Sequence, residues 1–471
     1  MEPPSADAAV PAWAAEVRKD ARPVYAAIAE AIAAAVRDGR LAPGERLPPQ
    51  RRLAEALGLD LTTITRAYAE ARARRLVEAR VGQGTFVAKG APAPASRGPA
   101  SRGAADMSMN LPPLFDDPAL ARRMWAALAT VERTQGLPLL LGYQEAGGAA
   151  ADRAAGTRWL SARLPEVTQA QVLVAPGAQG ALLAVTSLLA ARGETVCAEA
   201  LAYPGFRALT AHLGVRVEGL AMDAEGLLPD AFEAACRAHA PKALYCTPTL
   251  NNPTTATMSL ERRRAVVAIA RRHGVPIIED DAYDRLPTDA PPPLAALAPD
   301  LTWHVGGLAK VMSPALRIAY LAAPDSRGAA RAAAALRATV GMASPLTAAL
   351  ATRWIEEGTD LAILAALRRE TVARFALVRQ ILEGHDYVGR PDAFHVWLPL
   401  PPGWERAAFT ARLGARGVGV VMSDAFSTLA PAPQAVRLSL GAPETRADLA
   451  AALRQIRALL DQDPAWALSA V

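Results

Sequence analysis

Lysine is scarce in this chain. Of the 51 basic residues among 471, only four are lysines, namely Lys19, Lys89, Lys242 and Lys310. An arginine side chain stays protonated and delocalised, so it cannot act as an amine nucleophile. Any covalent chemistry of a side-chain amine must therefore use one of these four residues.

Cysteine and long apolar runs are also rare. Cys197, Cys236 and Cys246 form no CxxC pair and cannot all pair with one another, which favours reduced thiols in a cytoplasmic protein and predicts no metal site. No stretch of about 18 residues is free of charges and turn-forming residues, which argues against a transmembrane helix. Residues 1–23 carry acids and prolines where a signal peptide has a basic start and an apolar run. We expect a cytoplasmic protein with no membrane partner.

The composition indicates a folded chain of several domains. Hydrophobic residues make up 52% and charged residues 21%, which suits a large core and excludes a disordered chain. At roughly 100–200 residues per domain, the length predicts two or three. Residues 89–109, rich in Ala, Pro, Gly and Ser, are expected to form a flexible linker. The predicted division is a tail at 1–21, a small unit at 22–88, the linker at 89–109 and a large unit at 110–462.

The small unit combines helical and hairpin patterns. Apolar residues recur at helical spacing over 24–36, and further helices are predicted over 50–57 and 61–77. Alternation around Gly82-Gln83-Gly84 indicates a β-hairpin. Three helices followed by a two-stranded wing predict a winged helix-turn-helix.

In that fold the second helix of the helix-turn-helix enters the major groove of double-stranded DNA with its N-terminal residues against base edges. Hydroxyls and arginines there bind phosphates or bases. A solvated charged face is the ordinary alternative for any single arginine. The candidate residues for operator DNA are Arg46, Arg51, Thr62, Thr63, Thr65, Arg66 and Gln83.

Residues 22–88 resemble the DNA-binding domain of GntR-type regulators. The matching phrases are GRLAPGERLPPQRRLAEALGL and TTITRAYAEARARRLVEARVGQGTFV. The family usually has a Ser-Arg or Thr-Arg pair just before the threonines, where this chain has Asp60-Leu61. The exchange of an arginine for a carboxylate is expected to weaken that DNA contact or to alter the preferred operator.

The large unit alternates short β-rich runs with Ala/Leu-rich helices, which predicts an α/β fold with a mostly parallel sheet. The predicted strands are 172–176, 195–199, 215–220, 243–248, 275–280, 301–306 and 317–322. Strands near 394–400, 418–422 and 435–440 follow long helices and predict a smaller α+β lobe. The large lobe is expected over about 140–345 and the small lobe over about 346–462.

Two strand ends in the large unit carry residues suited to aldehyde chemistry. Lys310 in VGGLAKVMSPALR follows a predicted strand, and a lysine in a partly apolar site can lose its proton and attack an aldehyde. Asp280 ends the strand VPIIED, where a carboxylate points into the crevice at the carboxyl edge of a parallel sheet. There it can pair with a protonated pyridine nitrogen. Alone, Lys310 would be read as a surface lysine and Asp280 as a helix cap.

Further motifs offer ligands for a phosphorylated ring. PGAQG (176–180) leads from a strand into a helix start, whose free amides favour phosphate. Asn252 in NNPT can donate to a phenolate, although Asn-Pro is also an ordinary turn. Tyr203 in AYPGF can stack on a ring, although lone tyrosines are usually in a core or an interface. Arg317 can bind phosphate, and Arg437 in AVRLSLG can bind a carboxylate through two hydrogen bonds.

The order PGAQG, AYPGF, NNPT, EDDAY, LAK, LR and VRLS resembles fold-type I pyridoxal-phosphate (PLP) enzymes of the aspartate aminotransferase class over roughly residues 110–460. The resemblance implies that Lys310 forms the internal aldimine and that Asp280 partners the pyridinium nitrogen. It also implies a homodimer in which Tyr143, in LGYQEAGG, reaches the phosphate of the neighbouring subunit. The other contacts that it implies are Asn252 and Tyr283 at the ring hydroxyl, Tyr203 on the ring, Ala178, Gln179 and Arg317 at the phosphate, and Arg437 at an effector carboxylate.

The run before the lysine differs from that class, which usually carries hydroxyls there. This chain has Gly307-Leu308-Ala309, and each lost hydrogen bond to a charged phosphate costs about 1.5–3 kcal/mol. PLP is therefore expected to dissociate reversibly and to be a candidate signal itself.

The winged helix, the linker and the aminotransferase-like body together resemble the MocR subfamily of transcription regulators. The resemblance implies a head-to-tail homodimer that senses PLP, or a small amine or amino-acid effector, through the aldimine at Lys310. Two alternatives stay open. One is an active aminotransferase with an accessory DNA-binding domain, and the other is a cofactor-free DNA-binding protein on an inactive scaffold.

Overall fold

The computed structural model describes residues 12–14, 23–37, 40–42, 44–73, 76–80, 84–88 and 105–462. The chain divides into two compact units, Met1–Arg102 and Gly103–Val471, which are treated separately. Most of the predicted tail and residues 89–104 of the predicted linker lie outside the described residues.

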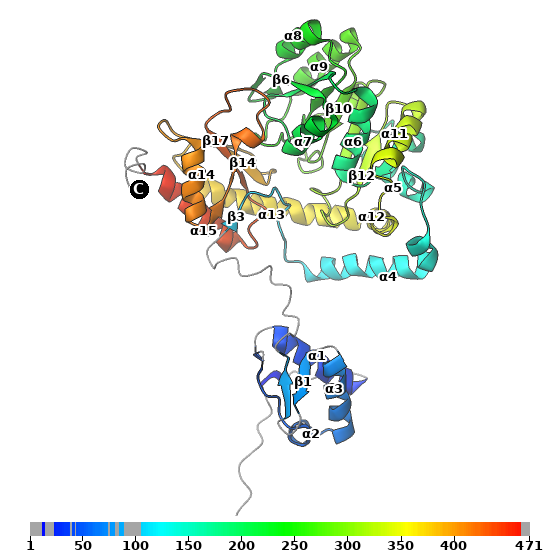
Figure 1. The fold of residues 1–471 in the computed structure, drawn as a ribbon, viewed down its shortest axis with the longest axis vertical. Helices are drawn as coiled ribbons and strands as arrows, with labels where there is room; N and C mark the ends of the chain where they lie inside the picture. The colour runs from blue at the N-terminus through cyan, green and yellow to red at the C-terminus, as the bar shows by residue number, and fades with distance from the viewer. Residues whose placement is uncertain are drawn as a thin grey trace, which may run out of the picture. The chain divides into compact units, whose positions relative to one another are not determined.

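The N-terminal unit is a winged helix-turn-helix, as predicted (Figure 1). Its described elements are a short 3-10 turn (Ala12–Ala14), α1 (Val24–Arg37), α2 (Gln50–Leu57), α3 (Leu61–Ala73), β1 (Val77–Arg80) and β2 (Gly84–Val87). Ile28 and Ile32 of α1 and Ile64 and Tyr68 of α3 are buried in one core, because each pair is spaced by four residues on one helical face. The strands β1 and β2 pair in antiparallel fashion as the wing.

A seven-stranded sheet forms the centre of the C-terminal unit. Its strand order is β4-β12-β11-β10-β9-β5-β6, and only β12 runs antiparallel to its neighbours. All seven predicted strands are present, so the prediction of a mostly parallel sheet is confirmed. The strands are β4 (Val172–Ala175), β5 (Thr195–Glu199), β6 (Arg216–Leu220), β9 (Leu244–Cys246), β10 (Ile277–Asp280), β11 (Thr302–Gly307) and β12 (Ala319–Ala322).

Helices cover both faces of this sheet, which is why every residue of β4, β9, β10, β11 and β12 is buried. The connecting helices are α5 (Ala150–Ser161), α6 (Gly177–Leu189), α7 (Pro204–Leu213), α8 (Pro229–His239), α9 (Leu260–His273), α10 (Leu294–Leu297) and α11 (Ser326–Thr339). A short hairpin of β7 (Met222–Asp223) and β8 (Gly226–Leu227) precedes α8.

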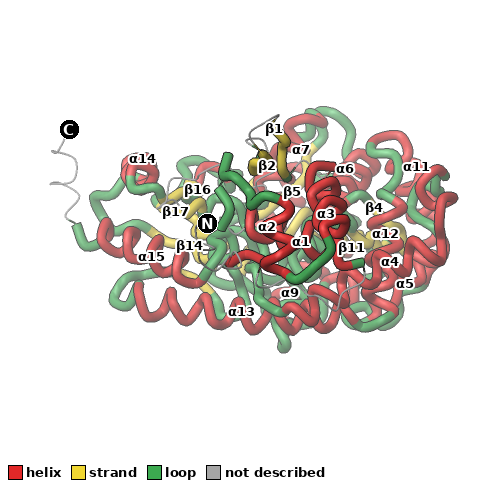
Figure 2. The backbone as a smooth tube through the Cα atoms, turned by 90° about the horizontal axis from the view of Figure 1, so that it is seen from below, coloured by secondary structure: helices red, strands yellow, loops and turns green. Residues whose placement is uncertain are grey.

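The small lobe is built on a four-stranded sheet of order β13-β14-β17-β16. Figure 2 shows the labelled strands β14, β16 and β17 gathered apart from β4, β5 and β11 of the large sheet. The elements are α12 (Pro345–Glu356), α13 (Thr359–Ile381), β13 (Val388–Gly389), β14 (His395–Pro399), α14 (Arg406–Ala415), β15 (Val418–Gly419), β16 (Val421–Met422), a 3-10 turn (Ser423–Ala425), β17 (Ala435–Ser439) and α15 (Arg446–Leu460).

The last part of the predicted linker is packed into this lobe. Strand β3 (Ala105–Asp106) pairs in parallel with β15, and the following Met107 is fully buried. Residues 105–109 of the predicted linker therefore belong to the folded C-terminal unit, because the two-residue strand β3 and the buried Met107 hold this segment in place.

Helix α4 (Pro118–Leu141) lies along one side of the C-terminal unit, below α12 and α13 in Figure 1. It packs against α12 and is kinked at Gly136, just before Pro138. Among the described residues, no helix is long and apolar enough to cross a membrane.

The contact of α5 with β12 generates a test of the fold. A Cβ atom at Gly156 would lie 2.4 Å from Cδ1 of the buried Tyr320, so Gly156→Ala must displace a packed ring. We expect a loss of about 1–3 kcal/mol in stability, visible as a lower thermal midpoint of the C-terminal unit by calorimetry. Gly414→Ala in α14 is the control, because no atom lies within 4 Å of its added Cβ and the change should be neutral or slightly stabilising. Equal midpoints for the two variants would contradict this packing.

Candidate functional site

The predicted site residues meet at the carboxyl edge of the large sheet. Asp280 is the last residue of β10, and Lys310 follows the end of β11 by three residues. Parallel strands end at the same edge, so their last residues converge on one crevice. Burial, and then the Asp280 charge, raises the pKa of Tyr203, whereas the Arg317 and Arg437 charges lower it, so these charged groups lie near Tyr203.

One carboxylate oxygen of Asp280 accepts a hydrogen bond, and the other has no partner. The Tyr245 hydroxyl donates to Oδ2 at 2.8 Å, while the buried Oδ1 has no hydrogen-bond partner. Burial raises the pKa of Asp280 to about 6, against the lowering effect of the Tyr245 hydrogen bond. Tyr245 is itself positioned by the Phe206 ring, which stacks on it at 3.7 Å between centroids. Oδ1 is thus an unpaired acceptor ready for a cationic N–H.

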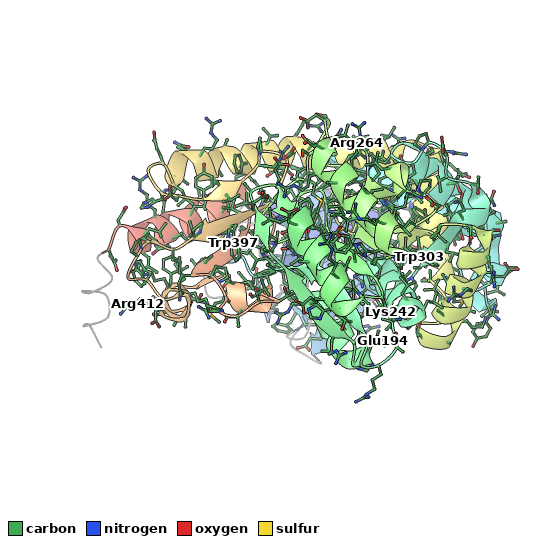
Figure 3. All side chains as sticks on the ribbon, turned by 90° about the horizontal axis from the view of Figure 1, so that it is seen from above. Glu194, Lys242, Arg264, Trp303, Trp397 and Arg412 are labelled. Carbon is green, nitrogen blue, oxygen red and sulfur yellow. The ribbon has the colours of Figure 1, made fainter. Side chains whose placement is uncertain are left out.

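The Lys310 amine has a pKa well below the ordinary lysine value. Burial, and then the nearby Arg437 and Arg317 charges, lower its pKa to about 8, although Asp280 acts in the opposite direction. Its Nζ donates to the Asn110 carbonyl oxygen. The other described lysine, Lys242, lies at the surface 3.3 Å from Glu194 (Figure 3). Lys19 and Lys89 lie outside the described residues.

The start of α6 and Arg317 form a basic corner. Gly177 adopts a φ of 79°, and a Cβ there would lie 3.2 Å from Nη2 of Arg317, so only glycine fits without displacing the guanidinium. Arg317 itself has a φ of 52°, a conformation that is uncommon outside glycine. The free amides of Gly177 and Ala178 in the first turn of α6 add positive potential. The predicted Gln179 donates to the Gly205 carbonyl at 2.8 Å and keeps its buried Oε1 unpartnered.

The remaining predicted residues line the small-lobe side. Tyr283 is fully buried in the interior, and burial raises its pKa well above the ordinary value. Asn252 accepts a hydrogen bond from Nη1 of Arg437 at 3.1 Å. Arg437 lies over the Phe426 ring, 5.1 Å from its centroid, and its Nη2 donates to the Ser108 carbonyl. Tyr203 stays accessible at the mouth, with 36% of its surface exposed.

Sequence reasoning missed three polar residues of this site. Asn110 donates from Nδ2 to the Tyr283 hydroxyl at 2.9 Å and directly follows the stretch whose composition indicated a linker. His395 of β14 contacts the Asn251 carbonyl at 3.0 Å; burial, then the Arg437 and Lys310 charges, lower its pKa to about 3, so it is neutral. Tyr245 had a usable signal, since it lies on the strand beside the one that ends in Asp280.

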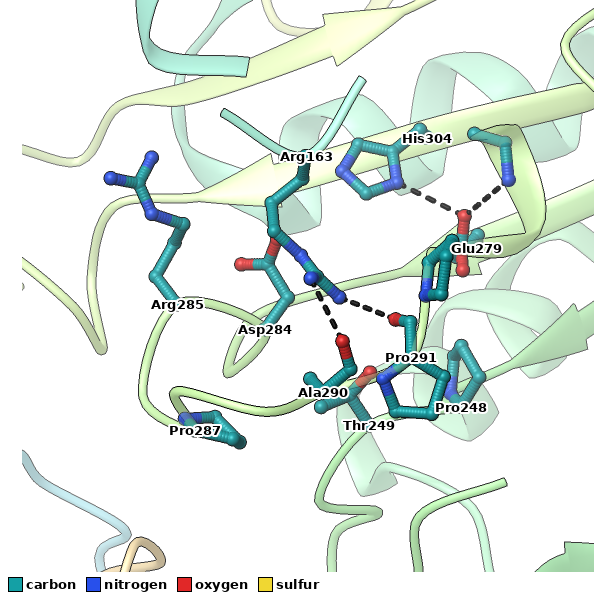
Figure 4. Close-up of polar contacts among 12 residues, drawn as sticks. Arg163, Pro248, Thr249, Glu279, Asp284, Arg285, Pro287, Ala290, Pro291 and His304 are labelled. Carbon is teal, nitrogen blue, oxygen red and sulfur yellow. Dashed lines mark hydrogen bonds and ion pairs between the residues drawn. The ribbon is translucent and has the colours of Figure 1, made fainter. Parts of the chain in front are cut away.

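The opposite face of the same strand carries a second buried polar cluster (Figure 4). Glu279 accepts from the Leu294 and Ala295 amides at 2.7 and 2.9 Å and contacts His304 Nδ1 at 3.1 Å. Burial opposes a charge on His304, but the Glu279 hydrogen bond and the nearby carboxylates outweigh it and raise the pKa to about 9.

Arg163 anchors the loop beyond this cluster. It donates to the Ala290 and Pro291 carbonyls at 3.0 and 2.6 Å and lies 3.5 Å from Asp284. Glu279, Asp281 and His304 are close enough to share a cation, yet His304 and Arg163 already supply positive charge there. The cluster therefore serves to hold β10, and with it Asp280, in place.

Tyr143 does not join the crevice of its own chain. Its side chain is 96% exposed, in the segment that follows α4. The predicted role for this residue in a neighbouring subunit's site stays a prediction.

The predicted DNA-binding residues lie on exposed parts of the N-terminal unit. Arg46, Arg51, Thr62, Thr65 and Arg66 are exposed, Thr63 is half-buried, and Gln83 lies outside the described residues. Asp60 begins α3: it accepts from the Thr62 amide at 2.8 Å and from the Thr62 hydroxyl at 2.7 Å, which lowers its pKa. The unusual carboxylate thus caps the helix, while the Thr65 hydroxyl is shared between Gln50 and the Leu61 carbonyl.

Comparison with known families agrees with both units. Residues 115–456 match the family described as aminotransferase class I and II, and residues 24–87 match bacterial regulatory proteins of the gntR family.

One curated relative matches this chain across both units. The uncharacterized HTH-type transcriptional regulator YdeF of Bacillus subtilis is 30% identical over 95% of this chain and 97% of its own. The HTH-type transcriptional regulator TauR of Rhodobacter capsulatus is 31% identical over 64% of this chain and 67% of its own. Among solved structures, the α-aminoadipate aminotransferase LysN of Thermus thermophilus superposes with a TM-score of 0.69 at 24% identity, over 79% of this chain and 94% of that one. This last similarity shows the fold alone.

The Tyr245–Asp280 hydrogen bond can be tested by its pH dependence. The folded pKa of Asp280, about 6, exceeds the ordinary 3.8, so ionisation of this group costs stability as the pH rises between these values. Tyr245→Phe removes the stabilising donor, so its destabilisation should be small at pH 5 and grow to about 1–3 kcal/mol above pH 7. Thermal midpoints across this range measure the effect. The control is Tyr387→Phe, a partly buried tyrosine of the small lobe, and a loss independent of pH would contradict the assignment.

Proposed function

The chain belongs to the aminotransferase class I and II family, and on this premise we propose that it is a PLP-dependent transcription regulator that binds operator DNA through its gntR-type unit. Its aminotransferase-like body senses PLP, or a small amine or amino acid, and the protein acts in the cytoplasm as a homodimer. The observation that carries the proposal is the unpaired, buried Asp280 Oδ1 near the charge of Lys310, in a chain that also contains a winged helix.

The crevice fits PLP by its chemistry. Lys310 offers an amine with a pKa of about 8, Asp280 offers an unpartnered buried oxygen, and Gly177 with Arg317 offers an anion corner. Bound PLP supplies an aldehyde that condenses with amines and a ring that withdraws electrons. Ala178 and Gln179 would hold the phosphate with Arg317, Asn252 and Tyr283 the ring hydroxyl, Tyr203 the ring face, and Arg437 an effector carboxylate.

The binding of PLP is proposed to be reversible. The chain before Lys310 offers no hydroxyl, because it reads Gly307-Leu308-Ala309, and a Cβ at Gly307 would meet Ala178 at 3.4 Å. The phosphate then depends on backbone amides and Arg317, with each lost hydrogen bond costing about 1.5–3 kcal/mol. Loose retention favours a sensor over an enzyme, and the relatives that match this chain over most of its length are named as transcriptional regulators.

A homodimer is supported by exposed apolar side chains on and after α4. Such a patch is costly on a monomer and marks a protein contact. A second copy would cover it and would bring Tyr143 towards the neighbouring phosphate corner. The large exposed apolar residues are Trp125, Leu137, Leu140, Leu141 and Tyr143.

Lys310 should control cofactor capture with a defined pH dependence. Only the uncharged amine attacks an aldehyde, so the rate of covalent uptake of PLP should rise with pH and level off above about 8. At pH 7 the rate should be about tenfold below the plateau. Stopped-flow absorbance measures it, and Lys310→Ala should abolish the signal yet leave operator binding intact. Lys242→Ala is the control, and a flat rate between pH 6 and 9 would contradict the assignment.

The N-terminal end of α3 should carry DNA affinity. Thr63→Ala combined with Arg66→Ala removes groups that contact bases or phosphates, so operator binding should weaken by about 10- to 100-fold. Fluorescence anisotropy, with a fragment found by footprinting the DNA upstream of the protein's own gene, measures it. Arg72→Ala, in the last turn of the same helix, should change affinity much less. PLP absorbance should stay the same in both variants, and unchanged affinity in the double variant would remove α3 from the interface.

A further inference from the structure

The segment that begins with β3 and leads towards α4 enters the proposed effector site through its backbone. Its residues Ser108 and Asn110 each give a carbonyl oxygen to a cationic side chain of the crevice, the first to Arg437 and the second to Lys310. This segment, residues 105–110, is also the first described part of the chain after residues 89–104, through which the N-terminal unit is joined. It is called the entry segment below.

The entry segment is anchored at two points on the small lobe. The Met107 amide donates to the Gly419 carbonyl at 2.8 Å, and the Met107 carbonyl accepts from the Ser439 amide at 3.1 Å. Because Ser439 lies two residues beyond Arg437 on β17, the same strand holds both the entry segment and the guanidinium that binds it. A small shift at Arg437 is thus transmitted directly to the segment.

Asn110 fixes the other end. It is 8% exposed, its Nδ2 donates to the Tyr283 hydroxyl at 2.9 Å and lies 3.4 Å from His395 Nδ1, and its Oδ1 lies 3.5 Å from the Ser439 hydroxyl. These side-chain contacts hold Asn110 in place even when its backbone carbonyl loses the hydrogen bond from Lys310. Ser108, in contrast, has only the guanidinium on its carbonyl and the Asp106 carboxylate on its amide among the hydrogen bonds of the described residues.

On the Nε–Nη2 edge of the Arg437 guanidinium, a carboxylate would compete with the Ser108 carbonyl. Nη1 is engaged by Asn252 Oδ1, Nη2 by the Ser108 carbonyl, and Nε is buried without a partner. A carboxylate binds arginine best through two parallel hydrogen bonds, and the Nε–Nη2 edge offers these. A carboxylate on that edge would share Nη2 with the Ser108 carbonyl, and two acceptor oxygens crowded onto one nitrogen repel each other.

We propose that the entry segment is the part of the proposed effector site that reads a carboxylate: a carboxylate-bearing amine binds the Nε–Nη2 edge of Arg437, displaces the Ser108 carbonyl and loosens residues 105–109 from β15 and β17. Asn110 remains as the pivot. The inference rests on the proposed function, because the amine of the same molecule is captured by PLP held at Lys310. An amine without a carboxylate leaves the Ser108–Arg437 hydrogen bond in place.

Two reagents separate the carboxylate from the amine chemistry. Aminooxyacetate and methoxyamine both react with the aldehyde of PLP through the same aminooxy group, but only aminooxyacetate carries a carboxylate. Each is added to the full-length, PLP-loaded protein. Absorbance reports the reaction at the aldehyde, and hydrogen exchange with mass spectrometry reports the entry segment and its partner strand through peptides that cover 105–111 and 436–441.

Both reagents should change the absorbance, and only aminooxyacetate should speed exchange at the Met107 and Ser439 amides, by about tenfold. Peptides of α9, in the large lobe, should not respond to either reagent. In Arg437→Gln, aminooxyacetate should react more slowly because its carboxylate has lost its partner, and once the absorbance change is complete it should no longer speed exchange. Arg454→Gln is the matched control, because Arg454 is exposed on α15 of the same lobe, and it should behave as the unaltered chain does.

The outcomes separate the two proposals. Equal exchange with both reagents, or unchanged exchange after a full absorbance change with aminooxyacetate, overturns the role of the entry segment and leaves the proposed function standing. No absorbance change with either reagent overturns the proposed function and this inference with it. Even if Arg437→Gln fails to fold, the difference in exchange between aminooxyacetate and methoxyamine on the unaltered protein tests the role of the entry segment.

Discussion

Burial of the Asp280 carboxylate is the constraint on which the crevice depends. A carboxylate removed from water is costly unless it is paired, and Tyr245 satisfies only one of its two oxygens. The same removal from water lowers the pKa of Lys310. One physical cause therefore produces both an acceptor for a ring cation and an amine that is reactive near neutral pH. The surrounding fold has to hold these groups together against that cost.

Two features of the fold meet this cost. Strand β10 lies at the centre of the large sheet between β9 and β11, with Glu279 on its opposite face bound to two amides and His304. The strand cannot move away from the crevice without breaking these buried contacts as well. Phe206 and Tyr245, stacked at 3.7 Å, fix the donor to Asp280 in the same manner. Rigid support of this kind is what a binding site needs to keep an unsatisfied group in position.

The chain order of strands and helices could be read from the sequence because fully buried parallel strands are short, continuous apolar runs. Asp280 and Lys310 could be placed from the same rule, since both follow such runs. Residues 105–109 could not be placed, because Met107 and Met109 are the only large apolar side chains in a stretch of small residues, and composition alone favours a linker. The contact of Arg437 with Ser108 could not be predicted either, because the acceptor is a backbone carbonyl, which every residue carries. Asp60 was recognised as unusual, but its function as a helix cap depends on the Thr62 geometry.

The position of the entry segment constrains how sensing and DNA binding are coupled. If a carboxylate on Arg437 favours a loosened segment, then any state of the N-terminal unit that pulls on that segment favours carboxylate binding by the same free energy, since linkage is reciprocal. The coupling free energy cannot exceed the difference between the free energies with which the carboxylate and the Ser108 carbonyl bind the Nε–Nη2 edge. A neutral carbonyl is the weaker of the two, because a charged acceptor forms the stronger hydrogen bond with a guanidinium. In this proposal the exchange therefore favours the carboxylate while the effector is bound, and the Ser108 hydrogen bond forms again when the effector leaves, as a regulator requires.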